Sequence, residues 1–242
     1  MKIAVLCDLH LSDSKHSPQY HFLASAVDQL RKDGIQTVLT LGDISACGEL
    51  EALQNYYALL EGFSLYTLLG NSDIRSSETK DQWMSAVSNF KFNFYEKTVL
   101  GINNPRGSIN EDDRKEIEAL HNGDILAMHH GIRALDTESQ TFFRDLAQRK
   151  RLTILNAHHH RFIDEEMDNF RMITFRALDP DKAIGNFPSI TYLDVMDGEI
   201  SLEEKLITIS PSIIKMQANF SEYPVLTTTE MFRMPRITKY MV

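Results

Sequence analysis

The first ten residues carry the feature that most constrains this chain. Five apolar residues in a row, from Ile3 to Cys7, are followed at once by Asp8 and, two positions later, by His10. An unbroken apolar run at a chain start predicts a strand that is buried on both faces of a parallel sheet. Ligands bind outside the carboxyl ends of such strands, and residues two apart in an extended segment point to the same side. We therefore expect Asp8 and His10 to face one metal ion.

The same pattern recurs along the chain. Residues 35–41 form a second apolar run that leads into Gly42-Asp43, and residues 63–69 form a third that leads into Gly70-Asn71. Helical spacing of apolar residues predicts helices over 19–31 and 49–61, between these strands. Three successive strand–helix units with polar groups at the strand ends indicate an α/β fold. Further helices are expected over 78–89, 111–120 and 137–148, and further strands over 91–102 (two short ones), 124–128 and 152–155.

The pattern changes after residue 160. A hairpin is expected around Asp168-Asn169, and Asp197-Gly198 is a two-residue hairpin signal between strands over 190–195 and 200–207. The last segment is rich in Met, Thr and Pro and has no clear periodicity. We therefore expect a main domain over residues 1–208 and a C-terminal extension over 209–242, which packs on the domain or forms an oligomer contact.

Charge and cysteine content restrict the function. The net charge is −9, and the basic residues are scattered, which argues against a protein that grips nucleic acid by its backbone. No apolar stretch is long enough to span a membrane. Cys7 and Cys47 are too few for a disulfide framework, and two buried or half-buried free thiols suit a reducing compartment. We expect a cytoplasmic protein without a membrane partner.

The polar residues at strand ends comprise two carboxylates, one amide and four imidazoles. A mononuclear site needs only about three or four ligands, so this larger set indicates two ions that share one carboxylate. Imidazole and carboxylate together favour Mn, Fe, Zn, Ni or Co over Mg or Ca. Two such ions could clamp the oxygens of a phosphoryl group during displacement. The expected ligands are Asp8, His10, Asp43, Asn71, His129, His158 and His160.

In the order of these blocks the chain resembles the calcineurin-like metallophosphoesterases. The matching blocks are Asp8-x-His10, Gly42-Asp43, Gly70-Asn71, the isolated His129 and His158-x-His160. The resemblance implies a four-layer αββα sandwich of two mixed β-sheets flanked by helices, with a di-metal site at the strand ends. It also implies that one ion is held by Asp8, His10, Asp43 and His160, and the other by Asp43, Asn71, His129 and His158. His129 is preferred to His130 because the family ligand is usually the first residue after the strand.

Two departures from the family pattern bear on activity. The family often has a histidine after Gly-Asn that binds phosphate and stabilises the leaving group, and here that residue is Ser72. The last block opens with Ala157 where glycine is usual. The expected catalytic residues are Asn71 and Asp73, and the expected substrate contacts are Ser72, His130 and Arg75. An arginine, Arg75 or Arg106, could clamp a phosphate oxygen in place of the missing histidine, although the sequence favours a plain surface arginine at each position.

The expected function is that of a dinuclear metal-dependent phosphoesterase with a metal-bridging hydroxide as nucleophile. Family members without the histidine lean towards phosphodiesters, so the resemblance favours a phosphodiesterase that acts on a small phosphate ester; manganese is one suitable metal. A phosphomonoesterase that uses the same site is an alternative. The rival from another class is a protein-binding scaffold on this fold, like a retromer subunit that resembles these enzymes. Such scaffolds tend to lose ligands, and this chain has a residue of the right type at every position.

Overall fold

The computed structural model describes residues 2–183 and 188–209 of the chain. It divides the chain into two units, Met1–Ile207 and Thr208–Val242, and all elements below belong to the first unit. The expected extension over 209–242 lies outside the described residues except for its first residue, so its role stays a prediction. None of the helices in the described part is long and apolar enough to cross a membrane.

The first sheet is mixed and has five strands. Its three parallel strands are joined by helices, as the recurring strand–helix pattern predicts, and a hairpin from the end of the unit pairs antiparallel beside the first strand. In spatial order the strands are β11 (Glu199–Leu206), β10 (Ser189–Met196), β1 (Ile3–Leu6), β2 (Thr37–Thr40) and β3 (Ser64–Thr67).

The second sheet is also mixed and has six strands. Its four central strands are parallel, and an antiparallel strand pairs at each edge. In spatial order the strands are β4 (Phe90–Phe94), β5 (Lys97–Gly101), β6 (Ile125–Ala127), β7 (Leu152–Asn156), β9 (Phe170–Thr174) and β8 (Ile163–Met167).

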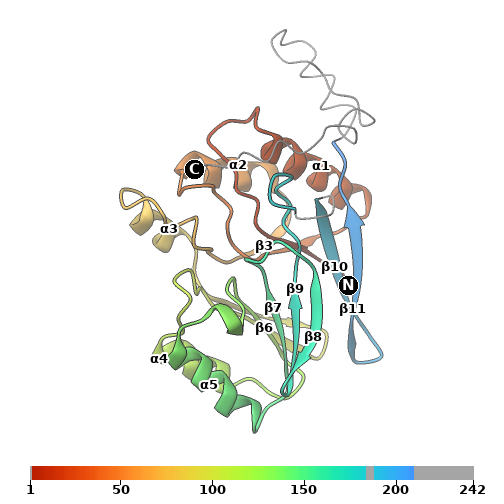
Figure 1. Cartoon of the computed structure of the whole chain (residues 1–242). Helices are drawn as coiled ribbons and strands as arrows, with labels where there is room; N and C mark the ends of the chain where they lie inside the picture. Colours follow the sequence, from red (N-terminus) through yellow and green to blue (C-terminus); the bar gives the residue numbers. More distant parts are fainter. Residues whose placement is uncertain (1, 184–187, 210–242) are drawn as a thin grey trace, which may run out of the picture. The chain divides into compact units, whose positions relative to one another are not determined.

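Helices cover the outer face of each sheet (Figure 1). On the first sheet lie α1 (Pro18–Lys32) and α2 (Leu50–Leu59), and the short α3 (Lys80–Ala86) follows β3. On the second sheet lie α4 (Glu111–Glu118) and α5 (Thr137–Ala147), preceded by the 3-10 turn η1 (Ile132–Ala134). The four layers are therefore helix, sheet, sheet and helix, and the expected αββα sandwich is confirmed.

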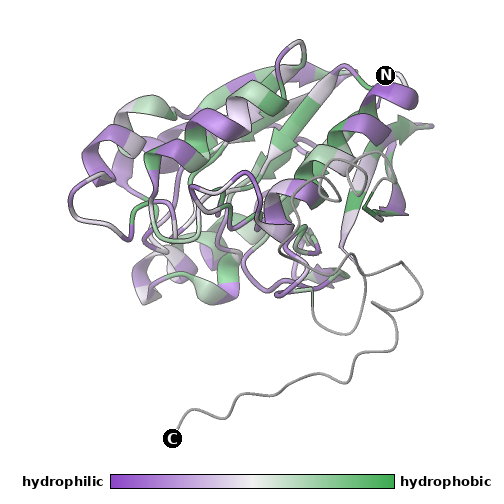
Figure 2. Ribbon diagram, turned by 90° about the horizontal axis from the view of Figure 1, so that it is seen from above, coloured by the Kyte–Doolittle hydropathy of each residue, from purple (hydrophilic) through white to green (hydrophobic). Residues whose placement is uncertain are grey.

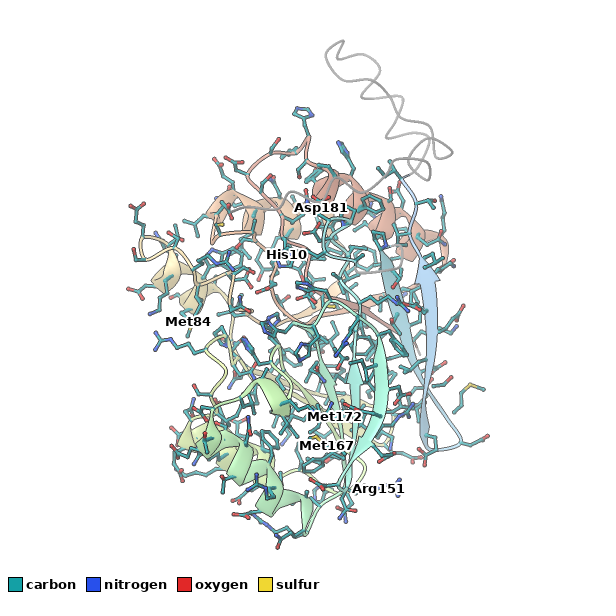
Figure 3. All side chains as sticks on the ribbon, viewed as in Figure 1. His10, Met84, Arg151, Met167, Met172 and Asp181 are labelled. Atoms are coloured by element: carbon teal, nitrogen blue, oxygen red, sulfur yellow. The ribbon has the colours of Figure 1, made fainter. Side chains whose placement is uncertain are left out.

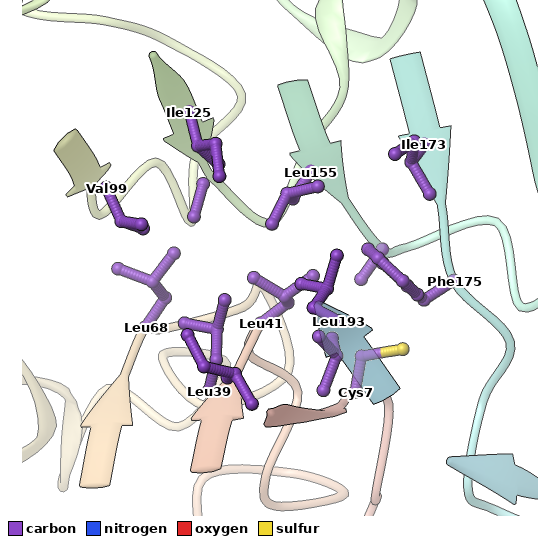
Figure 4. Close-up of a cluster of buried hydrophobic side chains, with 14 of the residues drawn as sticks. Cys7, Leu39, Leu41, Leu68, Val99, Ile125, Leu155, Ile173, Phe175 and Leu193 are labelled. Carbon is purple, nitrogen blue, oxygen red and sulfur yellow. The ribbon is translucent and has the colours of Figure 1, made fainter. Parts of the chain in front are cut away.

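Apolar residues that alternate along the strands form the core between the sheets (Figure 4). Leu39, Leu41 and Leu68 of the first sheet face Val99 and Leu155 of the second. The residues between them point outwards and pack against helices, as Leu100, Leu126 and Ile154 do beneath α4 and α5. Since both faces of the central strands are covered, their sequences are unbroken apolar runs. Figure 2 shows these green strands beneath helices that carry both purple and green segments.

The buried hydroxyl of Tyr56 on α2 links this helix to the first sheet. It lies 2.7 Å from Oγ1 of Thr40 on β2 and 3.0 Å from Oγ1 of Thr67 on β3. All three side chains are buried, so water cannot replace these hydrogen bonds. The contact fixes the position of α2 over the strands that lead to Asp43 and Asn71.

We expect Tyr56→Phe to lower the free energy of unfolding by about 1–3 kcal/mol, because it leaves two buried threonine hydroxyls without this partner. Urea unfolding of metal-free protein measures the change. Tyr57→Phe is the matched control, since the Tyr57 side chain is 38% exposed, and it should change stability by less than about 0.5 kcal/mol. Equal effects of the two substitutions would contradict the importance of the buried hydroxyl.

Candidate metal centre

The backbone of the site is left-handed at five of the seven expected ligands. The φ angles are 50° at Asp8, 46° at His10, 52° at Asp43, 70° at His158 and 56° at His160. The expectation that Asp8 and His10 share a side because the segment is extended is therefore wrong: β1 ends at Leu6, and both residues lie in a tight loop. Such conformations cost free energy at residues other than glycine, and they cluster at functional sites.

Backbone hydrogen bonds hold the Asp8–His10 loop from two sides. On one side, the N–H of Asp8 donates to Gly42 O (3.1 Å), and the N–H groups of Leu9 and His10 both donate to Asp43 O (2.8 and 3.0 Å). On the other side, the N–H of Asp179 donates to Asp8 O (3.1 Å). The strained loop is thus fixed by contacts to segments far away in the sequence.

Two glycines allow the loops after β2 and β3 to touch. A Cβ atom on Gly70 would lie 2.1 Å from Oδ1 of Asp43, and one on Gly42 would lie 2.5 Å from the backbone nitrogen of Gly70. Any side chain at Gly70 would push the Asp43 carboxylate away. The Gly-Asp and Gly-Asn pairs of the sequence are therefore a steric requirement of this site.

The expected ligands gather in two groups that meet at Asp43. Asp43 Oδ2 lies 3.2 Å from Nε2 of His10, and Oδ1 lies 3.5 Å from Nε2 of His129. Oδ1 of Asn71 is also near His129, at 3.2 Å from Nε2. Ligand-type atoms within 4.8 Å of one another form one group of Asp8, His10, Asp43 and His160, and another of His129, His130 and His158.

The donor groups fit bound cations. Asp8 is fully buried, yet neither of its carboxylate oxygens has a hydrogen-bond partner among the described residues. A buried carboxylate without a partner is costly, and a cation would compensate for that cost. Mixed imidazole and carboxylate ligands suit divalent transition metals. The Asp8 group could hold one ion and the histidine group another, with Asp43 placed to reach both.

His129 and His130 both lie at the site, but they are fixed differently. His129 has Nδ1 2.8 Å from Leu41 O, which directs Nε2 towards Asp43. His130 has Nδ1 2.9 Å from Asn104 O, and its ring centre is 4.3 Å from that of His158. Either histidine can contribute to the second group, so the preference for His129 stays a prediction.

Burial sets the charges of the site. It lowers the pKa of His129 to about 3 and those of His158 and His160 to about 4, so these imidazoles are neutral and can bind a cation without losing a proton. Burial and the neighbouring Asp43 charge raise the pKa of Asp8 to about 8. Burial opposes the charge of Asp43 too, but hydrogen bonds from His10 and Ser72 outweigh it and hold that pKa below its usual value.

The third loop is held by Asp73. Asp73 is fully buried, and its carboxylate accepts hydrogen bonds from the backbone N–H groups of Ser45 (2.8 Å) and Gly70 (2.8 Å). The side chain therefore joins the second and third loops. Ser72 is also fully buried, and its N–H donates to Asp43 Oδ1 at 2.8 Å. Neither side chain presents a solvent-accessible surface, and their assigned catalytic and substrate roles stay predictions.

The remaining expected residues lie at the edge of the site or away from it. Arg75 is exposed, and its guanidinium lies beside Ala46 O (3.5 Å) and Cys47. Arg106 is exposed as well. One expectation on burial is wrong: Cys47 is exposed, whereas Cys7 is buried as expected.

Sequence reasoning missed two residues that organise the site. Asn104 Oδ1 accepts the backbone N–H groups of both His129 (2.9 Å) and His130 (3.1 Å). Asp179 is buried, with Oδ2 3.4 Å from Nδ1 of His10. Asn104 carried only a turn signal, and Asp179 follows an apolar pair, Ala177-Leu178, that resembles a strand end.

The stability of the metal-free protein should fall as pH rises from about 7.5 to 9. Burial raises the pKa of Asp8 to about 8 and that of Asp73 to about 7, so the folded chain keeps protons that the unfolded chain has lost. Histidines are largely neutral in both states over this range. Urea unfolding with a chelator should show a loss of about 1 kcal/mol. Asp8→Asn should flatten the slope, and a wild-type stability that rises with pH would contradict the assignment.

Several solved structures are similar to this chain, and the one with a TM-score above 0.5 has the same fold. An archaeal phosphodiesterase is 14% identical with a TM-score of 0.49, over 85% of this chain and 100% of that one. A putative 5'-nucleotidase from Staphylococcus aureus is 12% identical with a TM-score of 0.52, over 90% of this chain and 57% of that one. Zinc-complexed Vps29 from Entamoeba histolytica is 16% identical with a TM-score of 0.44, over 85% and 98%.

Sequence comparison identifies the family. No curated protein matches the chain. The family model described as calcineurin-like phosphoesterase matches residues 1–185, which include every expected metal ligand. The match extends over more than half of the 242 residues. The chain therefore belongs to the calcineurin-like phosphoesterase family.

Proposed function

We propose that this chain hydrolyses small phosphate esters with two divalent transition-metal ions, and that phosphodiesters are preferred. The observation that carries the proposal is the place of Asp43 between the two ligand groups, with one carboxylate oxygen near His10 and the other near His129. Asp43 would be the shared ligand. The first ion would also contact Asp8, His10 and His160, and the second Asn71, His129 and His158.

Each ligand has a defined task in this proposal. The ions, when bound, would supply the Lewis acidity and the activated, bridging hydroxide that ester hydrolysis needs. Asp8 and Asp43 would provide the negative charge that holds them, and the neutral histidines would orient them without adding charge. Mn, Fe, Zn, Ni and Co all suit this ligand set, and manganese is the first to test.

The preference for diesters follows from the third loop. Ser72 occupies the position where many family members have histidine, and it is fully buried beneath Asp43. It offers no imidazolium to a leaving oxygen, so esters with good leaving groups should react best. A phosphodiester carries less negative charge than a phosphomonoester. Its hydrolysis therefore depends less on an imidazolium that neutralises this charge. The monoesterase reading remains the alternative for the same site.

His130 is the best-placed substrate contact. Its Nδ1 lies beside Asn104 O, which leaves Nε2 as the second ring nitrogen, and the ring packs beside that of His158. The imidazole could then bind a phosphoryl or leaving-group oxygen. Arg75 is proposed only as a second contact, because its guanidinium lies beside Ala46 and Cys47.

The scaffold alternative is less well supported. A protein that serves only to bind a partner would have no need for Asp8, whose buried carboxylate lacks a hydrogen-bond partner among the described residues. Such a group reduces stability unless a cation compensates, so retaining it favours a metal-dependent activity. A cytoplasmic location and a homo-oligomeric contact through residues 209–242 stay predictions.

Asp43→Ala should lose both ions and all measurable turnover, because it removes the shared ligand. His160→Ala should weaken chiefly one ion. Metal analysis after manganese reconstitution and gel filtration measures the number of bound ions. Hydrolysis of bis-p-nitrophenyl phosphate measures turnover. Wild-type protein that retains only trace metal after reconstitution with Mn, Zn or Ni would overturn the proposal. Turnover that survives in Asp43→Ala would do the same.

We expect His130→Ala to retain both ions but to hydrolyse diesters with poor leaving groups about 10²-fold more slowly, with a smaller effect on activated aryl diesters. A leaving-group series at fixed metal concentration tests this. His159→Ala is the matched control, since His159 is the exposed neighbour of two expected ligands. Loss of one ion from His130→Ala would instead make His130 a ligand.

A further inference from the structure

His10 is held between two carboxylates. Its Nε2 lies 3.2 Å from Asp43 Oδ2, on the side of the proposed ions, and its Nδ1 lies 3.4 Å from Asp179 Oδ2. Both His10 and Asp179 are buried, and Nδ1 has no closer hydrogen-bond partner among the described residues. Asp179 Oδ2 is thus placed to accept a hydrogen bond from Nδ1–H of His10. A small rotation of the imidazole ring would shorten the 3.4 Å contact to hydrogen-bond length.

Asp179 is itself fixed by hydrogen bonds to α1 and to its own loop. Its Oδ1 accepts hydrogen bonds from Nε2 of Gln19 on α1 (3.1 Å) and from the backbone N–H of Asp181 (2.9 Å). Its own N–H donates to Asp8 O. With Oδ1 occupied, Oδ2 is left for His10. Figure 3 labels His10 and Asp181, both in the part of the molecule that carries α1.

The two histidines nearest Asp43 are therefore supported by different groups. Nδ1 of His129 faces a neutral acceptor, Leu41 O, at 2.8 Å, whereas Nδ1 of His10 faces a carboxylate. A neutral imidazole carries one N–H, so an acceptor at Nδ1 directs the Nε2 lone pair to the metal side. A carboxylate acceptor also makes that lone pair a stronger ligand than a carbonyl does.

We infer that Asp179 is a positioning residue for the first ion: it accepts a hydrogen bond from Nδ1–H of His10 and so presents Nε2 as the ligand. The inference rests on the proposed function, because it supposes that an ion is bound beside His10. It adds a residue outside the expected ligands and assigns it to one ion only. Asp179 contacts neither His129 nor Asn71 in this arrangement, so the second ion should not depend on it.

The test is manganese binding to metal-free protein by calorimetry, followed by metal analysis. Asp179→Ala should bind one of two ions about 10- to 100-fold more weakly and the other unchanged. Asp179→Asn keeps an oxygen that can accept a hydrogen bond from Nδ1–H. It should therefore bind the affected ion more tightly than Asp179→Ala does. Asp181→Ala is the matched control: its carboxylate also accepts from Gln19, at 3.0 Å, but it is exposed, and no contact joins it to His10 in the described structure. Both affinities of Asp181→Ala should stay within about twofold of wild type.

The unfolding midpoint of each metal-free variant, together with its two affinities, separates positioning from a general structural role. Asp179→Ala also removes the acceptor of Gln19 and of the Asp181 N–H, so its metal-free midpoint should fall, but a positioning role requires that only one ion be bound more weakly. The inference is overturned if Asp179→Ala binds both ions as wild type does, or if it weakens both ions equally while lowering the metal-free midpoint. Wild type that binds no manganese would instead overturn the proposed function, so the two failures are distinguishable.

Discussion

The buried carboxylate of Asp43 is the group on which the rest of the site depends. Its oxygens lie between imidazoles from the two sheets, its backbone carbonyl holds the loop of Asp8 and His10, and it accepts the N–H of Ser72. These contacts require that the Asp43 carboxylate is ionised and that its backbone carbonyl is held in one position. The absence of a side chain at Gly70 leaves space for that carboxylate. The strained backbone of three loops is therefore organised around one ionised group.

The site forms only when the two sheets of the sandwich pack against each other. His129 follows a strand of the second sheet but hydrogen-bonds Leu41 O of the first, and Asn103 from the second sheet accepts the N–H of Leu69 from the first. The apolar core beneath these contacts fixes the distance between the sheets (Figure 4). A change in the core that shifts one sheet would move one ligand group relative to the other. The precision of the site is thus a property of the core as much as of the loops.

Local signals made much of this architecture predictable from the sequence. Apolar runs and turn residues placed the strands to within a few residues, and Asp197-Gly198 does join β10 to β11 as a two-residue hairpin. The backbone at Asp8 and His10 was mispredicted because its left-handed form depends on hydrogen bonds to Asp43 O and from Asp179 N–H, which no local pattern encodes. Asp179 itself was missed for the same reason, since its partner is about 170 positions away in the chain.

The pairing of β1 with β10 also has a consequence for biosynthesis. The strand that precedes Asp8 is synthesised before its second neighbour in the sheet, which begins at Ser189. The loop after β1 likewise waits for Asp179 to close it. During translation this strand must therefore remain incompletely paired until most of the unit has been made. The two ligand groups described above can therefore come together only after the segment that contains Asp179 has been made.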